Sequence, residues 1–474
     1  MDKSQRYVVR ALFALIIILS SWCAINALAG SNISVNIALI FLTFATLLPL
    51  YIHAKRSGFN MFEPIYAYIL IFSVFYLFTS VYIYNREEQY HTSILVDIYN
   101  DSTNLPVIYV LSFSILLFHL GYNVVTKRIR FDSESFNIEI PQSINVRTIV
   151  TFFYIVSVVF RIYGYSVGKM GSLTTTEGFN FPGVSLVYFI TNIWYIYFAY
   201  FAISYIKNKN DRIFFVFILL FEILIVLISG DRRYIVQIVL MILAVYYYVY
   251  KRIPWKLFGI LSLFFVFIYL PITTFYGYYL TSGMKGADDY AALISFTFSS
   301  LSQMDFDNIL SDFMFNPIAE SLFALPTLIF PYSQYDLRGI HWGPVGIISL
   351  LNNIVPSGIL GRINTRQYYE SYASDALPYS VEYSPLTFQF SNEVILSFGL
   401  VWLPVAFLTL GFLMGLIYKR LFFKDSVSKW MYIGLFFGIT YSTNFGLLTT
   451  ELLTPLRLLL YYLIWDFLFH RKNA

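Results

Sequence analysis

The chain has 474 residues, of which 58% are hydrophobic and only 12% are charged. This composition excludes both an ordinary soluble domain and a disordered chain, because each carries a much larger charged fraction. The net charge of +4 is spread over many turns, so we expect no nucleic-acid partner. The only cysteine, Cys23, excludes a disulfide within the chain.

Long apolar runs predict an all-α polytopic membrane protein. A helix needs about 20 apolar residues to cross the hydrocarbon core of a bilayer. The runs are too long and too uniformly apolar for the strands of a membrane barrel. We expect about twelve spans, at residues 11–29, 34–52, 61–84, 105–125, 147–167, 183–206, 212–229, 234–250, 256–275, 392–418, 430–450 and 452–469.

The spacing of these runs divides the chain into three parts. Residues 1–275 hold the first nine spans, residues 276–391 form one large loop, and residues 392–474 hold the last three spans. Segments 317–331 and 344–360 within the loop are bounded by prolines and too short to span. We interpret them as short helices on the membrane surface.

The positions of lysine and arginine predict the orientation. Basic loops stay cytoplasmic, and most of the basic residues fall in alternate turns of the chain. This pattern places both termini in the cytoplasm and the large loop outside it. The turns that we place inside carry Lys3, Arg6 and Arg10; Lys55 and Arg56; Lys127, Arg128 and Arg130; Lys207, Lys209 and Arg212; Lys251 and Arg252; Lys419, Arg420 and Lys424; and Arg471 and Lys472.

Known catalytic and nucleotide-binding motifs are absent from the sequence. There is no Walker loop, no HExxH, no CxxC and no glycine-rich dinucleotide fingerprint. The five histidines are scattered along the chain. We therefore expect neither a metal site nor a cofactor.

Two arginines stand at an outer turn, where the orientation rule disfavours them. Arg232 and Arg233 follow Gly230 and Asp231, at the point where a helix is expected to enter the membrane. A helix N-terminus offers unpaired N–H groups, and the arginine fork matches phosphate oxygens in pairs. The pair is a candidate cradle for a lipid-linked diphosphate. Pairing with Asp231, or contact with ordinary lipid headgroups, is the simpler alternative.

Two further arginines lie near the outer ends of spans. Arg161 is placed in span 5 and Arg457 in span 12. An arginine at membrane depth costs several kcal/mol unless it is paired or faces a wet cavity, so both are candidates for support of the same anionic group. Snorkelling to the interface is the alternative explanation.

The large loop supplies the remaining candidate residues. His341 is its only histidine and a candidate general base, with Arg338 three residues before it. Arg362 and Arg366 are four residues apart and would share a helix face, as a phosphate clamp requires. Salt bridges to nearby acids would explain that spacing equally well. Glu393 lies at the loop exit, and the tyrosines and carboxylates of the loop are compatible with sugar binding.

These features resemble the bacterial O-antigen polymerases of the Wzy type. The resemblance is carried by the Gly230-Asp231-Arg232 turn, by the late outer loop with VPSGILGRINTR (355–366), and by Glu393 followed by Phe398-Gly399. Some family members carry an arginine and a glycine at a fixed spacing in two outer loops. That spacing is not matched here, since Leu243 and Ala373 stand at the corresponding positions.

The resemblance implies a metal-independent glycosyltransferase of GT-C-like architecture in the bacterial inner membrane. It would transfer a growing glycan from undecaprenyl diphosphate to a new lipid-linked repeat unit on the periplasmic face. His341 or Glu393 would be the catalytic base. The arginines at positions 161, 232, 233, 338, 362, 366 and 457 would bind diphosphate or substrate. A polysaccharide chain-length regulator is a further expected partner.

Three other functions remain open at this point. An O-antigen ligase has a similar plan, uses a loop histidine and differs in its acceptor. A flippase for lipid-linked oligosaccharides would carry charges in the middle of many spans, and Glu222 in span 7 is the clearest such charge here. A membrane scaffold would leave the outer arginines dispensable.

Overall fold

The computed structural model describes 20 separate stretches or positions of the chain, most of them helical. They are residues 3–28, 33–60, 62–73, 76–77, 105–129, 131, 138, 140, 144–166, 194–209, 211–229, 232–250, 256, 259–260 with 263, 391 with 394–395, 398–423 and 429–434 with 463. No strand occurs within these residues. They divide between two compact units. Unit 1 consists of Met1–Asp132, Ile318–Lys424 and Gly438–Leu463, and unit 2 of the remaining residues.

Helices form at nine of the predicted spans, with ends that differ from the prediction by up to about a dozen residues. In unit 1 they are α1 (Lys3–Leu28), α2 (Ile33–Ser57), α3 (Pro64–Ser73), α6 (Leu105–Thr126) and α21 (Leu403–Phe423). In unit 2 they are α7 (Ile144–Ser166), α9 (Trp194–Asn208), α10 (Arg212–Ser229) and α11 (Arg232–Tyr250). The residues predicted for spans 9, 11 and 12 lie almost entirely outside the described part.

Three described helices are long and apolar enough to cross a membrane. They lie at Ile33–Ser57, Leu105–Thr126 and Leu400–Phe422. Each exposes large apolar side chains on one face, such as Phe41 on α2 and Phe113 on α6, and buries the opposite face. Exposed apolar side chains of this kind are expected where lipid is the solvent. The protein is therefore a helical membrane protein.

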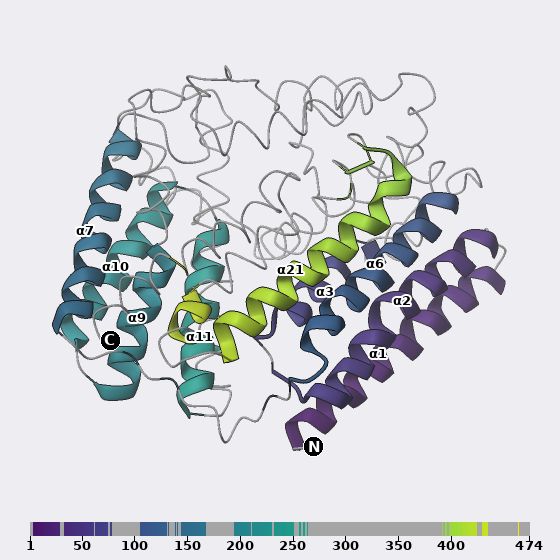
Figure 1. Ribbon diagram of the computed structural model, residues 1–474, viewed down its shortest axis with the longest axis horizontal. Helices are drawn as coiled ribbons and strands as arrows, with labels where there is room; N and C mark the ends of the chain where they lie inside the picture. Colours follow the sequence, from purple (N-terminus) through teal and green to yellow (C-terminus); the bar gives the residue numbers. More distant parts are fainter. Residues whose placement is uncertain are drawn as a thin grey trace, which may run out of the picture. The chain divides into compact units, whose positions relative to one another are not determined.

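Unit 1 is a layer of neighbouring helices in which α1 and α3 are antiparallel to α2, α6 and α21 (Figure 1). The ring of Phe13 on α1 contacts Tyr51 near the end of α2, so these two helices are antiparallel. Phe41 contacts Tyr109, and His53 bonds Asn123, so α2 and α6 are parallel. The C-terminal ends of α2 and α6 therefore meet at the same end of the unit as the N-terminal part of α1.

Glycines let the backbones of α6 and α21 come into direct contact. A Cβ atom placed on Gly411 would lie 2.1 Å from the carbonyl oxygen of Phe118, and one on Gly121 would lie 2.3 Å from that of Leu408. Gly415 faces Tyr122 one turn further along. Gly411 and Gly415 form a GxxxG pair, which allows close helix packing in membranes. The contact places α21 parallel to α6.

A glycine also sets the start of α21, which differs from the predicted span at 392–418. Residues 394 and 395 are helical, but Gly399 takes φ 89° and interrupts the helix. A short 3₁₀ turn, η4 (Leu400–Trp402), then leads into α21. Only glycine adopts this backbone conformation readily. The predicted single helix is therefore two segments joined at the Phe398-Gly399 pair.

In unit 2, α9 contacts α7, α10 and α11 (Figure 1). The start of α7 meets the start of α10 through an ion pair between Arg147 and Asp211. The hydroxyl of Tyr250, at the end of α11, donates to the carbonyl of Ile206, near the end of α9. Within the described part of unit 2, α7 is therefore parallel to α10, and α9 is parallel to α11. The back-to-back spans predicted at 212–250 are two separate helices, α10 and α11.

Candidate functional site

The Arg232-Arg233 pair opens a helix, as the sequence predicts. The helix α11 begins at Arg232, three residues after the last residue of α10. The first N–H groups of a helix have no partner within it, and its dipole favours negative charge at this end. The backbone therefore has the form of an anion-binding helix start. The side chains of these two arginines lie outside the described part.

Arg161 is held by a buried carboxylate from another helix. Its Nη1 donates to Oε2 of Glu222 at 2.7 Å, and its Nη2 donates to Oε1 at 2.7 Å. Arg161 lies five residues before the end of α7, and Glu222 lies in α10. The two residues are 4% and 1% exposed. This is the two-bond, parallel geometry that makes arginine–carboxylate pairs strong and directional.

A shell of aromatic side chains surrounds this ion pair. The hydroxyl of Tyr154, about two turns before Arg161 on α7, donates to Oε1 of Glu222 at 2.8 Å. The guanidinium of Arg161 lies 5.8 Å from the ring centre of Trp194 on α9 and 5.9 Å from that of Phe221 on α10. Aromatic faces attract cations, most strongly where water is excluded. Three helices thus contribute to one polar centre.

The ion pair accounts for two charges that sequence reasoning treated separately. Arg161 appears there as a candidate phosphate ligand, and Glu222 as the clearest mid-span charge. Each would be costly within a membrane if it stood alone, and each neutralises the other here. Glu222 lies seven residues before the end of α10, so the pair lies about 10 Å from that helix end. The two features therefore lie near the same end of unit 2.

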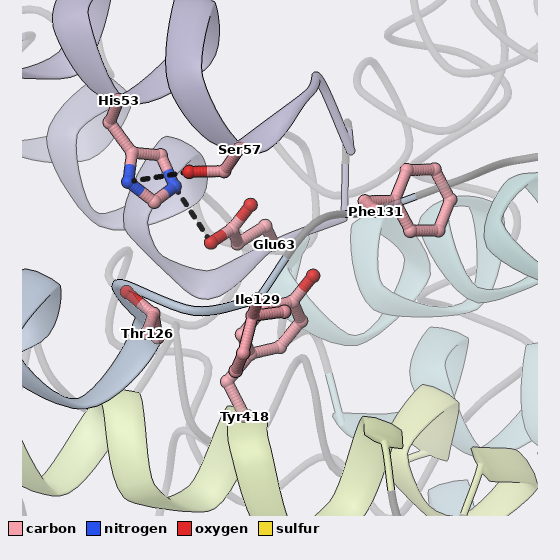
Figure 2. A pocket seen from close by; sticks show the side chains of 7 residues that line it. All are labelled: His53, Ser57, Glu63, Thr126, Ile129, Phe131 and Tyr418. Carbon is pink, nitrogen blue, oxygen red and sulfur yellow. Dashed lines mark hydrogen bonds and ion pairs between the residues drawn. The ribbon is translucent and has the colours of Figure 1, made fainter.

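Unit 1 contains a second buried polar cluster, centred on His53 and Glu63 (Figure 2). The Nε2 atom of His53 lies 2.9 Å from Oε1 of Glu63, which also accepts a 2.8 Å hydrogen bond from the hydroxyl of Tyr122. The other ring nitrogen of His53 lies 2.9 Å from Oδ1 of Asn123 and 3.3 Å from the hydroxyl of Ser57. The cluster connects α2, the turn before α3, and α6.

A small hollow adjoins this cluster. Its empty space is about 170 Å³, part of it open to the surroundings. The lining residues are His53, Ser57, Glu63, Thr126, Ile129, Phe131 and Tyr418. The side chains leave too little room for a sugar or a lipid headgroup. We therefore interpret the cluster as a polar connection between helix ends and not as a substrate site.

Most of the predicted site residues lie outside the described part of the chain. They are His341, Glu393, Arg338, Arg362, Arg366 and Arg457. That arginines from separate regions of the chain bind one anionic group together therefore stays a prediction. Within the described residues, no group of three or more histidine, cysteine or acidic side chains is arranged to hold a metal ion.

Sequence reasoning missed three structural features. The Arg161–Glu222 pair could have been found by asking which acid balances an intramembrane arginine, since both residues are expected in the outer halves of their spans. The GxxxG spacing of Gly411 and Gly415 is visible in the sequence. No sequence signal connects His53 with Glu63, because their contact depends on the turn between α2 and α3.

Comparison of the chain with protein-family models, with curated proteins and with solved structures finds no match.

Proposed function

We propose that this protein is a polymerase of lipid-linked oligosaccharide repeat units, of the O-antigen polymerase type. The observation that carries the proposal is the helix start at Arg232-Arg233, next to a buried arginine centre in a helical membrane protein. Such a site suits an anionic group at the membrane surface. A lipid diphosphate combines that charge with the required location. The resemblance described above supplies the reaction.

In this proposal the protein lies in the bacterial inner membrane, with about twelve spans, a GT-C-like fold and both termini in the cytoplasm. The donor is a growing glycan on undecaprenyl diphosphate, and the acceptor is one repeat unit on the same lipid. The large loop (276–391) covers the periplasmic side of the proposed active site. No metal takes part, since arginines carry the charge-stabilising role that a metal would otherwise have.

The reaction forms one glycosidic bond and breaks one sugar–phosphate bond. A hydroxyl oxygen of the acceptor sugar attacks the anomeric carbon of the donor, while the bond from that carbon to the diphosphate breaks. The bonding electron pair leaves with the undecaprenyl diphosphate, and the hydroxyl proton passes to His341 or Glu393. Arg232 and Arg233 stabilise the charge that develops on the leaving diphosphate.

The remaining arginines have supporting roles in this proposal. Arg362 and Arg366 bind the phosphates of the second lipid. Arg338 and Arg457 bind substrate on the same side of the active site. Arg161 already shares its charge with Glu222. Its support for the diphosphate is therefore indirect: the ion pair joins α7 to α10, the helix that precedes α11 in the chain.

The alternative functions differ in specific ways. A ligase would use the same donor with the lipid A core as acceptor. A flippase would need charged side chains along a transport path. The charge that most favoured it, Glu222, is buried against Arg161. We therefore place the flippase below the two transferases.

Surface polysaccharide from a strain lacking this protein provides the test. The strain is complemented with the wild type, with Arg232→Ala and Arg232→Lys, and with Arg212→Ala as the matched control. Arg212 is an exposed arginine at the start of α10, away from the proposed site. We expect Arg232→Ala to remove the ladder and leave core plus a single repeat unit, while the control keeps the full ladder.

The other outcomes also decide between functions. Loss of the single unit together with the ladder would replace polymerisation by ligation or export. A normal ladder with Arg232→Ala, at normal protein level, would contradict the assignment of the diphosphate site. The lysine variant separates charge from geometry, since lysine keeps the charge but loses the planar fork.

A further inference from the structure

Eight exposed basic side chains gather at one end of unit 1. They come from the N-terminal part of α1, the C-terminal ends of α2 and α21, and the residues just after α6. We call this surface the basic end of unit 1, and it consists of Arg6, Arg10, Lys55, Arg56, Lys127, Arg128, Lys419 and Arg420. The antiparallel contact of α1 with α2, and the parallel contacts of α2, α6 and α21, place them together.

These cations have no partner within the described part of the chain. No described residue forms a salt bridge or hydrogen bond with any of the eight side chains. The one described carboxylate of unit 1, Glu63, is 2% exposed and bonds inward to His53 and Tyr122. The described surface at this end therefore carries positive charge with no described acid to balance it.

The helix ends that carry the cations are tied to one another. His53 on α2 bonds Asn123 on α6 and also Glu63, while Tyr122 on α6 bonds the same carboxylate. Beyond α6, the N–H of Phe131 donates to the carbonyl of Ser57, and its ring packs on Phe422 of α21. Figure 2 shows these elements around the hollow. Cations on a fixed platform bind a ligand with less loss of entropy than cations on mobile loops.

We propose that the basic end of unit 1 binds the anionic headgroups of bilayer phospholipids. Insertion orientation alone requires only an excess of basic residues near the span ends. A group of four to eight lysines and arginines beside membrane helices also creates a surface that attracts anionic lipid. The cations stand within two turns of the ends of their helices, and the ends of membrane-spanning helices lie near the lipid headgroups. This function is separate from the proposed polymerase site.

The test uses the purified full chain in a neutral detergent. Binding of short-chain phosphatidylglycerol is measured by thermal stabilisation, with short-chain phosphatidylcholine as the neutral lipid and inorganic phosphate as the free anion. We expect stabilisation by phosphatidylglycerol alone, and a decrease as salt is added, because salt screens exposed charges. Equal stabilisation by the two lipids would overturn the proposal. Stabilisation by inorganic phosphate to the same extent would also overturn it.

Paired variants localise the effect. Lys55→Gln with Arg56→Gln, and separately Lys419→Gln with Arg420→Gln, should each weaken phosphatidylglycerol binding by roughly 30-fold, since each basic residue near the surface contributes about five-fold. Arg212→Gln with Lys256→Gln removes two exposed cations from unit 2 as the matched control. We expect that control to retain the wild-type affinity. An equal loss in the control would show a response to net charge and overturn the assignment to this surface.

Discussion

The two units bury polar groups in different ways. In unit 1 the backbones of α6 and α21 touch through glycines, and the polar residues His53, Glu63 and Tyr122 connect helix ends. In unit 2 an ion pair between α7 and α10 lies within an aromatic shell. The glycine contact of unit 1 depends on the small size of the side chains. The ion pair of unit 2 depends on the presence of both opposite charges. Of the proposed site residues, unit 2 holds Arg161, Arg232 and Arg233.

The largest expected effect comes from breaking the ion pair of unit 2. Glu222→Gln leaves the buried Arg161 with an uncompensated charge, which typically costs about 3 to 5 kcal/mol. The midpoint of thermal unfolding of the purified protein measures this effect. Tyr154→Phe removes one hydrogen bond to the same carboxylate and serves as the milder matched variant. A change no greater than that of Tyr154→Phe would show that the charge of Glu222 contributes little.

A charge-reversed variant provides a second test of the ion pair. Arg161→Glu combined with Glu222→Arg keeps one charge of each sign at the centre. If the pair acts by connecting α7 to α10, the reversed pair should recover part of the stability and glycan length that Glu222→Gln loses. Recovery of stability without glycan length would instead assign Arg161 a direct contact with the substrate.

The next largest effect concerns the glycine contact of unit 1. Gly411→Ala places a Cβ atom against the backbone of Phe118, and such overpacking costs about 3 kcal/mol where the neighbour cannot move. Gly259→Ala is the matched control, because its Cβ atom would meet nothing within 4 Å. Thermal unfolding of both variants tests the contact. Equal stability of the two would show that α6 and α21 separate without cost.

A smaller effect is expected at the polar cluster of unit 1. Glu63→Gln keeps an oxygen for His53 or Tyr122 but removes the negative charge that both donors face, at a cost of about 1 to 3 kcal/mol. Ser57→Ala removes only the longer, 3.3 Å contact with His53 and is the conservative comparison. Unfolding midpoints should rank the wild type above Ser57→Ala and Ser57→Ala above Glu63→Gln. The reverse order for the two variants would contradict the central place of Glu63.

The smallest effect belongs to an ion pair that is partly open to solvent. The Arg147 side chain is 57% exposed and pairs with Asp211 at the starts of α7 and α10. Exposed pairs contribute at most about 1 kcal/mol. Arg147→Gln should therefore change the unfolding midpoint far less than Glu222→Gln does. Similar losses from the two variants would remove the distinction between buried and exposed pairs in unit 2.

Helix positions could be predicted from the sequence because apolar length is a strong signal in a membrane protein. Spans such as 105–125 and 147–167 agree with α6 and α7 to within about three residues. The interruption at Gly399 could not be predicted by this signal, since the residues on both sides of it, 394–408, are apolar apart from Ser397. Backbone conformation there depends on a single glycine whose φ the composition does not reveal.

The site could be predicted only in part. The helix start at Arg232 follows from the local Gly-Asp-Arg-Arg turn, and the described backbone confirms it. The partner of Arg161 depends on which helix lies beside α7, which hydropathy does not encode. The orientation predicted from the basic residues stays a prediction. The roles of the loop residues stay predictions.

The contact between α6 and α21 has a consequence for biosynthesis. The helix α6 ends at Thr126, but its glycine-matched neighbour begins only at Leu403. During translation, α21 is synthesised long after α6. Until then, the face of α6 around Phe118 and Gly121 lacks the helix that packs against it in the folded protein. Unit 1 therefore closes late, after the residues of unit 2 up to 317 have been synthesised. A ribosome-bound chain that stops before residue 403 should present this face to lipids or to an insertion chaperone.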